Sequence, residues 1–243
     1  MSSPRSTARI AGVLYLLLVI TGVFAHLVVR DRVYEPGNAA VTVENIVANS
    51  TLFRLAVVAD ILMATVFVFL GIVLYMLLKD VDRKSATAMV VFVSVGAGMI
   101  LVNLIFHFAA WLVATDATYA TALGVEGSEA LVLLLVEMHH YGYLLAGVFF
   151  GLWLLPLGYL AYRSDYFPRV LGILLMAASA SWIIDTALRF AFPDLNEIVH
   201  IVVTIPTFAE FLLLLYLLVK GVRSPARSGQ TQATGETIEL TAT

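Results

Sequence analysis

The sequence predicts an all-α membrane protein, a polytopic bundle of six transmembrane helices with both termini in the cytoplasm. Three observations lead to this class. Of 243 residues, 61% are hydrophobic and 13% are charged, whereas soluble domains are about 45–50% apolar and about 25% charged. Apolar runs of about 20 residues, enough to cross about 30 Å of hydrocarbon as a helix, occur six times. Finally, lysine and arginine gather in alternate loops.

The apolar runs take up most of the chain. We place the spans at about 9–29, 51–78, 87–114, 131–162, 167–191 and 198–220. Together they form one transmembrane domain over residues 1–223, which leaves no room for a soluble catalytic domain. Residues 224–243 are mostly Ser, Thr, Gln, Gly and Ala, a composition too polar to bury a core. This segment is predicted to be a disordered cytoplasmic tail.

The distribution of positive charge predicts the orientation. Only four basic residues fall on the other side of the membrane from the termini: Arg30, Arg32, Arg54 and Arg189. The side that carries the termini holds ten: Arg5, Arg9, Lys79, Arg83, Lys84, Arg163, Arg169, Lys220, Arg223 and Arg227. Cytoplasmic loops are enriched in lysine and arginine. We therefore expect a multi-pass protein of the cytoplasmic (inner) membrane with both ends inside.

The first outer loop, residues 31–50, contains a helical pattern of its own. A turn signal at Pro36-Gly37-Asn38 is followed by Val43, Ile46 and Val47, which are spaced along one face of a helix. The loop is predicted to hold a short amphipathic helix. It either packs across the top of the bundle or covers a cavity.

Composition excludes several kinds of chemistry. The net charge of −3 and the scattered basic residues do not favour nucleic-acid binding. The chain has no cysteine, so disulfides, thiolate metal sites and a cysteine nucleophile are excluded. It has no mid-helix lysine for a retinal Schiff base and no P-loop. Any metal has to be held by His, Asp, Glu or carbonyl groups.

Ionisable residues inside the spans gather in the outer half of the membrane. At 1.5 Å per residue they lie about 9–18 Å from the predicted outer helix ends, and five of the six spans contribute. A charged residue at mid-bilayer costs about 2.5–3.5 kcal/mol, so these side chains should face the bundle interior and contact each other. The predicted ligand-binding residues are Asp60, Asn103, His107, Glu137, His139, His140, Tyr143 and Glu210.

A count of charges suggests what this polar layer binds. Four acids, Asp60, Glu137, Asp185 and Glu210, face two cations, Arg54 and Arg189. Asp185 and Arg189 are four residues apart, which predicts a structural ion pair within one helix. Two acids then lack a partner and need a proton, a protonated histidine or a bound cation. We therefore expect an outward-facing pocket for a cation, a proton or a small ligand, serving a sensing, accessory or transport role.

Two alternatives stay open. Glu137 and His140 have the E-x-x-H spacing of carboxylate-bridged metal bundles, but the motif occurs once. A divalent metal such as zinc, held by His107, His139 and Glu137, would allow a membrane-embedded metal-dependent hydrolase. The other alternative is a structural or partner-binding bundle, in which the polar residues only fix helix packing. An enzyme is not the favoured interpretation.

The stretch from His139 to Asp185 resembles a known family. It contains Tyr141-Gly142-Tyr143, Phe149-Phe150-Gly151-Leu152, Leu157-Gly158-Tyr159-Leu160 and Phe167-Pro168-Arg169. These segments resemble the bacterial six-pass membrane proteins catalogued as domain of unknown function 4386, and the resemblance covers nearly all of residues 9–221. It implies six spans and a bacterial cytoplasmic membrane, but no activity, substrate or cofactor.

The family pattern also bears on the predicted site. It places an acid two residues before a histidine, which corresponds to Glu137 and His139 here. In the family a histidine often follows the Phe-Phe-Gly-Leu segment, where this chain has Trp153. The resemblance thus favours His139 over His140 and removes one potential metal ligand.

Overall fold

The computed structural model describes residues 3–192 and 196–222, with the side chains of 196–207 excepted. Regular structure in this part of the chain is helical throughout, with no strand, which confirms the predicted all-α class. The predicted tail at 224–243 lies outside the described residues.

The helices follow one another with short connections. They are α1 (Pro4–Val23), the π-helix η1 (Phe24–Arg30), α2 (Asp31–Val33), α3 (Ala39–Ala48), α4 (Ser50–Leu78), α5 (Arg83–Thr115), α6 (Ala117–Leu123), α7 (Val125–Leu152), α8 (Leu154–Arg163), α9 (Arg169–Ala191) and α10 (Asn196–Val219). Among the described residues, five helical segments are long and apolar enough to cross a membrane: Pro4–Val33, Ser50–Leu78, Arg83–Thr115, Val125–Arg163 and Arg169–Ala191. These correspond to the first five predicted spans.

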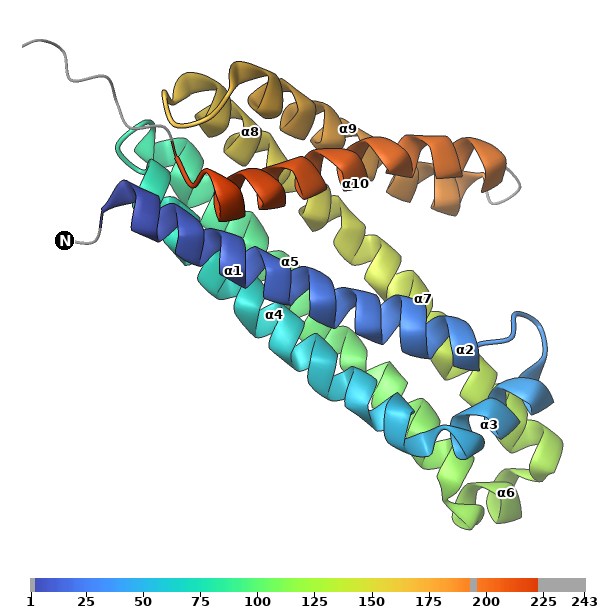
Figure 1. Ribbon diagram of the computed structural model, residues 1–243. Coiled ribbons are helices and arrows are strands. Elements are labelled where there is room, and N and C mark those ends of the chain that lie inside the picture. The colour runs from blue at the N-terminus through green and yellow to red at the C-terminus, as the bar shows by residue number, and fades with distance from the viewer. Residues whose placement is uncertain (1–2, 193–195, 223–243) are drawn as a thin grey trace, which may run out of the picture.

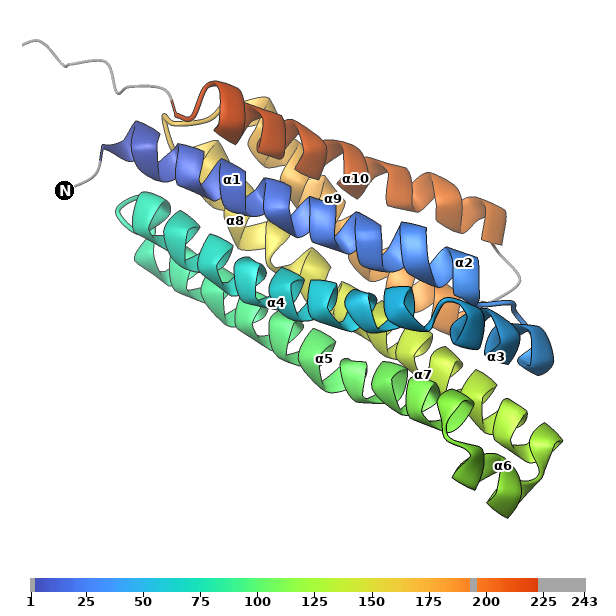
Figure 2. The same cartoon turned by 60° about the horizontal axis from the view of Figure 1, so that its bottom comes forward.

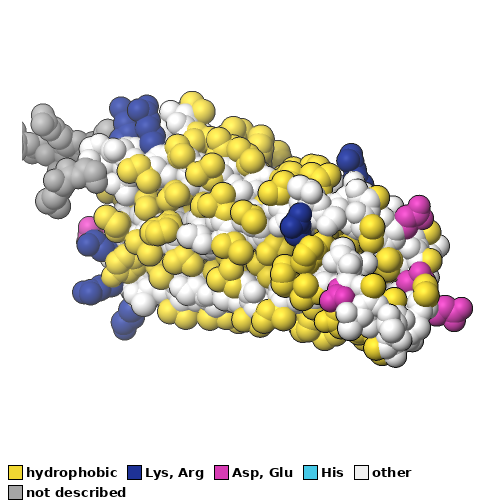
Figure 3. All heavy atoms as spheres, turned by 90° about the horizontal axis from the view of Figure 1, so that it is seen from below, with side chains coloured by type: hydrophobic (Ala, Val, Ile, Leu, Met, Phe, Trp, Pro, Cys, Tyr) yellow, Lys and Arg dark blue, Asp and Glu magenta, His cyan; other side chains and the backbone are white. Residues whose placement is uncertain are grey.

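The long helices run between two ends of an elongated bundle (Figures 1 and 2). The start of α1 and the end of α10 lie together at one end, here called the terminal end. The short helices α2, α3 and α6 lie at the opposite, distal end. Figure 3 shows a flank covered with apolar side chains, with most lysines and arginines at the terminal end and most acids at the distal end. This is the surface of a protein whose flank faces lipid.

The loop before α4 contains the predicted amphipathic helix, α3. Its first turn is capped by Asn38, whose side chain accepts a hydrogen bond from the Val41 backbone amide at 3.1 Å. The preceding Gly37 has φ +74°, a conformation that costs glycine little. Ile46 is fully buried in a distal apolar cluster that includes Phe53 and Val132. Helix α3 therefore packs across the distal end of the bundle.

The predicted fourth span is two helices, because α7 ends at Leu152 and α8 begins at Leu154. Pro156 explains the break: it has no amide hydrogen to bond the Leu152 carbonyl, and its ring crowds that carbonyl. Trp153 at the break is 2% exposed. Its ring lies 5.2 Å from Phe67 and 6.0 Å from Tyr15. The break thus places a large aromatic side chain at the centre of the bundle.

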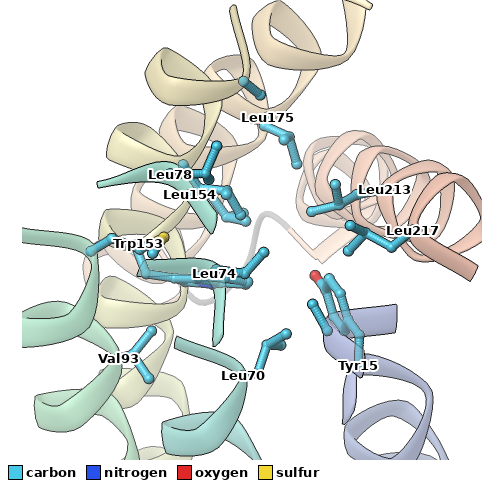
Figure 4. Packing of buried hydrophobic residues seen from close by; sticks show 14 of the residues in the cluster. Tyr15, Leu70, Leu74, Leu78, Val93, Trp153, Leu154, Leu175, Leu213 and Leu217 are labelled. Atoms are coloured by element: carbon cyan, nitrogen blue, oxygen red, sulfur yellow. The ribbon is translucent and has the colours of Figure 1, made fainter. Parts of the chain in front are cut away.

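The main apolar core occupies the terminal half of the bundle (Figure 4). Leucines of α4, α9 and α10 belong to one cluster with Trp153 there, and Tyr15 reaches the same region from α1. Leu70, Leu74 and Leu175 are completely buried. The terminal half is therefore held by ordinary apolar packing, which contrasts with the polar distal half described below.

Glycines allow α7, α8 and α9 to pack closely. A Cβ on Gly151 would lie 2.9 Å from the Ser179 carbonyl oxygen, and one on Gly147 would lie 2.9 Å from the Thr186 hydroxyl oxygen. A Cβ on Gly158 would lie 2.7 Å from the Gly172 carbonyl oxygen. Small residues let helix backbones approach in lipid, where packing drives association. The G-x-x-x-G pair of α7 thus serves packing within the chain.

Replacing Gly158 with alanine tests this packing. Because the new methyl group meets backbone atoms of α9 that cannot move independently, we expect the free energy of unfolding to fall by about 1–3 kcal/mol. Gly98→Ala is the matched control, since a Cβ there meets nothing within 4 Å. Thermal unfolding of purified protein should show a lower Tm for Gly158→Ala and an unchanged or slightly higher Tm for Gly98→Ala. Equal Tm values would contradict the interpretation.

Candidate functional site

A buried ion pair in the distal half joins the first two membrane-spanning helices. Asp60 of α4 is 1% exposed, and its Oδ2 accepts a hydrogen bond from Arg30 Nη2 of η1. The other carboxylate oxygen lies 3.5 Å from His26 Nε2. Arg30 Nη1 lies 3.0 Å from His26 Nε2, and Nη2 lies 3.3 Å from His139 Nε2. Asp60 therefore has a cationic partner that the count of charges in the sequence missed.

The π-helix η1 positions Arg30 and His26. The Asp31 backbone amide donates to the His26 carbonyl five residues earlier, a pattern that widens the helical turn and often occurs at functional sites. The predicted span ended at residue 29 and treated Arg30 as a loop cation. The available signal was the pair of polar residues four apart, His26 and Arg30, at the end of the first apolar run.

Helices α5 and α7 contribute three more buried polar side chains. Asn103 Nδ2 donates to the His139 carbonyl oxygen at 2.7 Å. His107 Nε2 lies 3.0 Å from the Phe53 carbonyl oxygen, and its ring stacks on Phe53. The His107 and His139 rings are 5.1 Å apart. A Cβ at Gly142 would lie 2.0 Å from Asn103 Oδ1, so glycine is needed there for the amide to reach α7.

These residues border a cavity at the distal end, here called the distal cavity. Its volume is about 220 Å³. The polar lining residues are His26, Arg30, Asp31, Tyr34, His107, His139, His140 and Tyr143. Both adjacent histidines of α7, His139 and His140, line it. The structure thus brings His107, His139, His140 and Tyr143 around one space, with Asp60 beside it behind Arg30.

Glu137 lies apart from this set. It is half-buried and does not line the distal cavity. It lies near Tyr34 in the turn after α2, where burial raises the pKa of the Tyr34 hydroxyl and the negative charge of Glu137 raises it further. Among the residues that the structure describes, no group of three His, Asp or Glu side chains is arranged to hold a metal ion. The predicted trio of His107, His139 and Glu137 is not brought together as a ligand set.

Arg189 and Arg54, the two cations counted in the sequence, have different partners. Arg189 Nε lies 3.0 Å from both carboxylate oxygens of Asp185, so the ion pair expected from their spacing is present in α9. Arg54 is exposed and stacks over the Trp111 ring at 5.2 Å. It forms no ion pair with a buried acid in the part of the chain that the structure describes, which corrects its place in the count of charges.

Glu210 belongs to a separate place in the bundle. Its Oε2 accepts a hydrogen bond from the Tyr15 hydroxyl at 2.5 Å, and its Oε1 accepts one from Trp182 Nε1 at 3.1 Å. It lines a second cavity of about 130 Å³, here called the central cavity, together with Trp153. The expectation that Glu210 joins the other polar residues is therefore wrong, because α10 turns it toward α1 and α9. Tyr143 alone among the described residues lines both cavities.

Comparison with known proteins now identifies the family. The model of the family described as "Domain of unknown function (DUF4386)" matches residues 10–221. The chain belongs to this family. The DUF4386 chain is also 38% identical over 74 residues to an "Uncharacterized protein" of Archaeoglobus fulgidus, a match that covers 30% of the chain and 43% of that relative. The chain thus matches less than half of the relative's length. No solved structure matches it.

Substitution of Asp60 tests the buried pair of this DUF4386 protein. Asp60→Asn leaves the Arg30 guanidinium buried without its counterion, so we expect the free energy of unfolding to fall by about 3–5 kcal/mol. Asp185→Asn is the matched control: the Arg189 side chain is 28% exposed and is free to turn toward water, so a loss of about 1 kcal/mol or less is expected. Denaturation of both variants provides the comparison, and equal losses would contradict the special role of Arg30.

Proposed function

We propose that this DUF4386 protein is a six-pass protein of the bacterial cytoplasmic membrane with both termini in the cytoplasm. Helix α10 has 24 residues and is thus about 36 Å long, enough for a sixth span. A Cβ on Gly12 of α1 would lie 2.9 Å from the Leu218 backbone nitrogen, so α10 ends beside the start of α1. The basic terminal end in Figure 3 supports a cytoplasmic position by the positive-inside rule.

Single cysteines test this topology without background, because the chain has no cysteine of its own. Glu44 of α3 and Lys84 of α5 are both exposed, at the distal and terminal ends respectively. We expect a membrane-impermeant maleimide to label Glu44→Cys in intact bacterial cells and to label Lys84→Cys only after permeabilisation. The reverse pattern would place the termini outside.

The role we propose is binding of a small polar ligand in the distal cavity, for sensing, accessory or transport work instead of catalysis. One observation carries this proposal: four histidines, Arg30 and Tyr143 from three different membrane-spanning segments border one space. Asp60 is already neutralised by Arg30, so a cation bound here would have to displace the guanidinium. A neutral or anionic molecule, or a proton on a histidine, would not. The proposed ligand is therefore a neutral or anionic molecule or a proton, and no longer the cation that the sequence also suggested.

Incomplete hydrogen bonding of the buried Arg30–Asp60 pair supports the proposal that the distal cavity binds a ligand. Arg30 Nε is buried and has no hydrogen-bond partner among the described residues, and Asp60 Oδ1 has only the His26 ring, 3.5 Å away. A buried polar group without a partner costs about 1–3 kcal/mol. Tyr143 also borders this cavity and brings a phenol hydroxyl close to it. A purely structural bundle would gain stability from satisfying these groups internally.

A matched pair of tyrosine variants tests ligand binding. We would screen carboxylates, phosphate, amino acids and polyols for a rise in Tm of the full chain in nanodiscs, and expect at least one class to stabilise it. Tyr143→Phe, which removes a hydroxyl from the cavity, should weaken that ligand about 2–10-fold, the worth of one hydrogen bond. Tyr141→Phe on the exposed side of the same helix should leave its affinity unchanged.

Two results would contradict the proposal. If no class of solute raises Tm, the cavity does not take a small polar ligand and the structural interpretation of the bundle stands. If the two tyrosine variants weaken a stabilising solute equally, that solute binds outside the distal cavity.

A further inference from the structure

The central cavity is a box of aromatic rings with one carboxylate. Five of its nine lining residues are aromatic, namely Phe67, Tyr143, Phe150, Trp153 and Trp182, and Glu210 completes its polar side. Neighbouring rings meet edge to face: Phe150 and Trp182 cross at 77° with centroids 6.0 Å apart, and Phe67 and Trp153 cross at 87° at 5.2 Å. Ring faces therefore look in several directions, as the walls of a cage do.

Glu210 has hydrogen-bond donors but no cation. Tyr15 and Trp182 each donate to one of its oxygens, which leaves about half of the acceptor sites of an ionised carboxylate unused. No lysine, arginine or histidine of the described residues forms an ion pair with it. An unpaired charge inside a bundle is costly. The cavity thus presents a carboxyl group for which the described residues supply no counterion.

We propose that the central cavity binds a small organic ammonium ion, with its charge met by Glu210 and by the faces of the surrounding rings. Aromatic faces attract alkylated ammonium groups through their quadrupoles, and the methyl groups of such an ion fit an apolar wall. A metal cation is disfavoured, because Ca²⁺ or Mg²⁺ needs six or more oxygen ligands and the described lining offers one carboxylate and one phenol. A volume of about 130 Å³ has room for such an ion, since one water needs about 10–15 Å³.

This site is separate from the one under the proposed function and takes the opposite class of ligand. The distal cavity has a guanidinium and imidazoles, with its buried acid neutralised. The central cavity has an acid without a cation. Tyr143 borders both cavities.

The test uses choline as the probe and the full chain in phosphatidylglycerol nanodiscs, where no lipid carries a quaternary ammonium group. Two of the three tryptophans, Trp153 and Trp182, line the cavity, so binding should change the intrinsic fluorescence. We expect saturable binding of choline and at least tenfold weaker binding of 3,3-dimethylbutan-1-ol, its uncharged isostere. Equal affinity for both molecules, or no choline binding, would overturn the proposal without any variant being needed.

Glu210→Gln provides the second measurement. Glutamine keeps the size of the side chain and one acceptor oxygen but loses the charge, so choline affinity should fall at least tenfold. Glu44→Gln, the same change at an exposed position of α3, is the control and should bind choline as the wild type does. Unchanged affinity in a folded Glu210→Gln variant would overturn the proposal.

A final experiment distinguishes a lipid headgroup from a free ammonium compound as the ligand of the central cavity. If phosphatidylcholine in the nanodisc weakens choline binding, a lipid headgroup occupies the central cavity. If phosphatidylcholine has no effect, the ligand is a free organic ammonium ion. Both results keep the ammonium site.

Discussion

The buried contact between Arg30 and Asp60 constrains the whole distal half of the bundle. Within the bilayer no water is present to solvate a carboxylate, so Asp60 requires a cation from another helix. Arg30 provides it, and the π-helical turn places His26 beside the same carboxylate. His139 then contacts the guanidinium, and Asn103 ties the His139 carbonyl to α5. His26, His139 and Asn103 thus surround one pair of charges, either directly or through a neighbouring polar group.

The two halves of the bundle consequently use different forces. The terminal half is a leucine-rich core closed around Trp153, and apolar packing with glycine contacts is sufficient there. The distal half exchanges some of that packing for hydrogen bonds and leaves a cavity. Helix α7 passes through both, with His139 and Tyr143 in the polar half and Gly151 packed on α9. Its break at Trp153 therefore marks the change from one environment to the other.

Sequence reasoning predicted what depends on periodicity and loop charge: the all-α class, the first five spans, the short helix α3 and the contact between Asp185 and Arg189. It failed for residues whose contacts depend on the direction in which they point from their own helix and on which helix lies beside them. Arg30 was placed outside the first span because the apolar run ends at residue 29, although it is the last residue of η1 and reaches Asp60. Glu210 was grouped with the distal acids by depth alone, although α10 directs it to Tyr15 and Trp182. Depth along a helix axis carries no lateral information, and only the packed bundle provides it.

Once Arg30 is recognised as the partner of Asp60, the buried acid that lacks a cationic partner can be identified. Asp60 and Asp185 each have an arginine, and Arg54 is not needed for either. Glu137 is half-buried, does not line the distal cavity and lies near Tyr34. Only Glu210, among the described acids, combines a position deep in the bundle with the lack of a cationic partner. The imbalance that the sequence distributes over four acids is therefore concentrated at one carboxylate inside an aromatic box, and that carboxylate determines which ligand the centre of the bundle attracts.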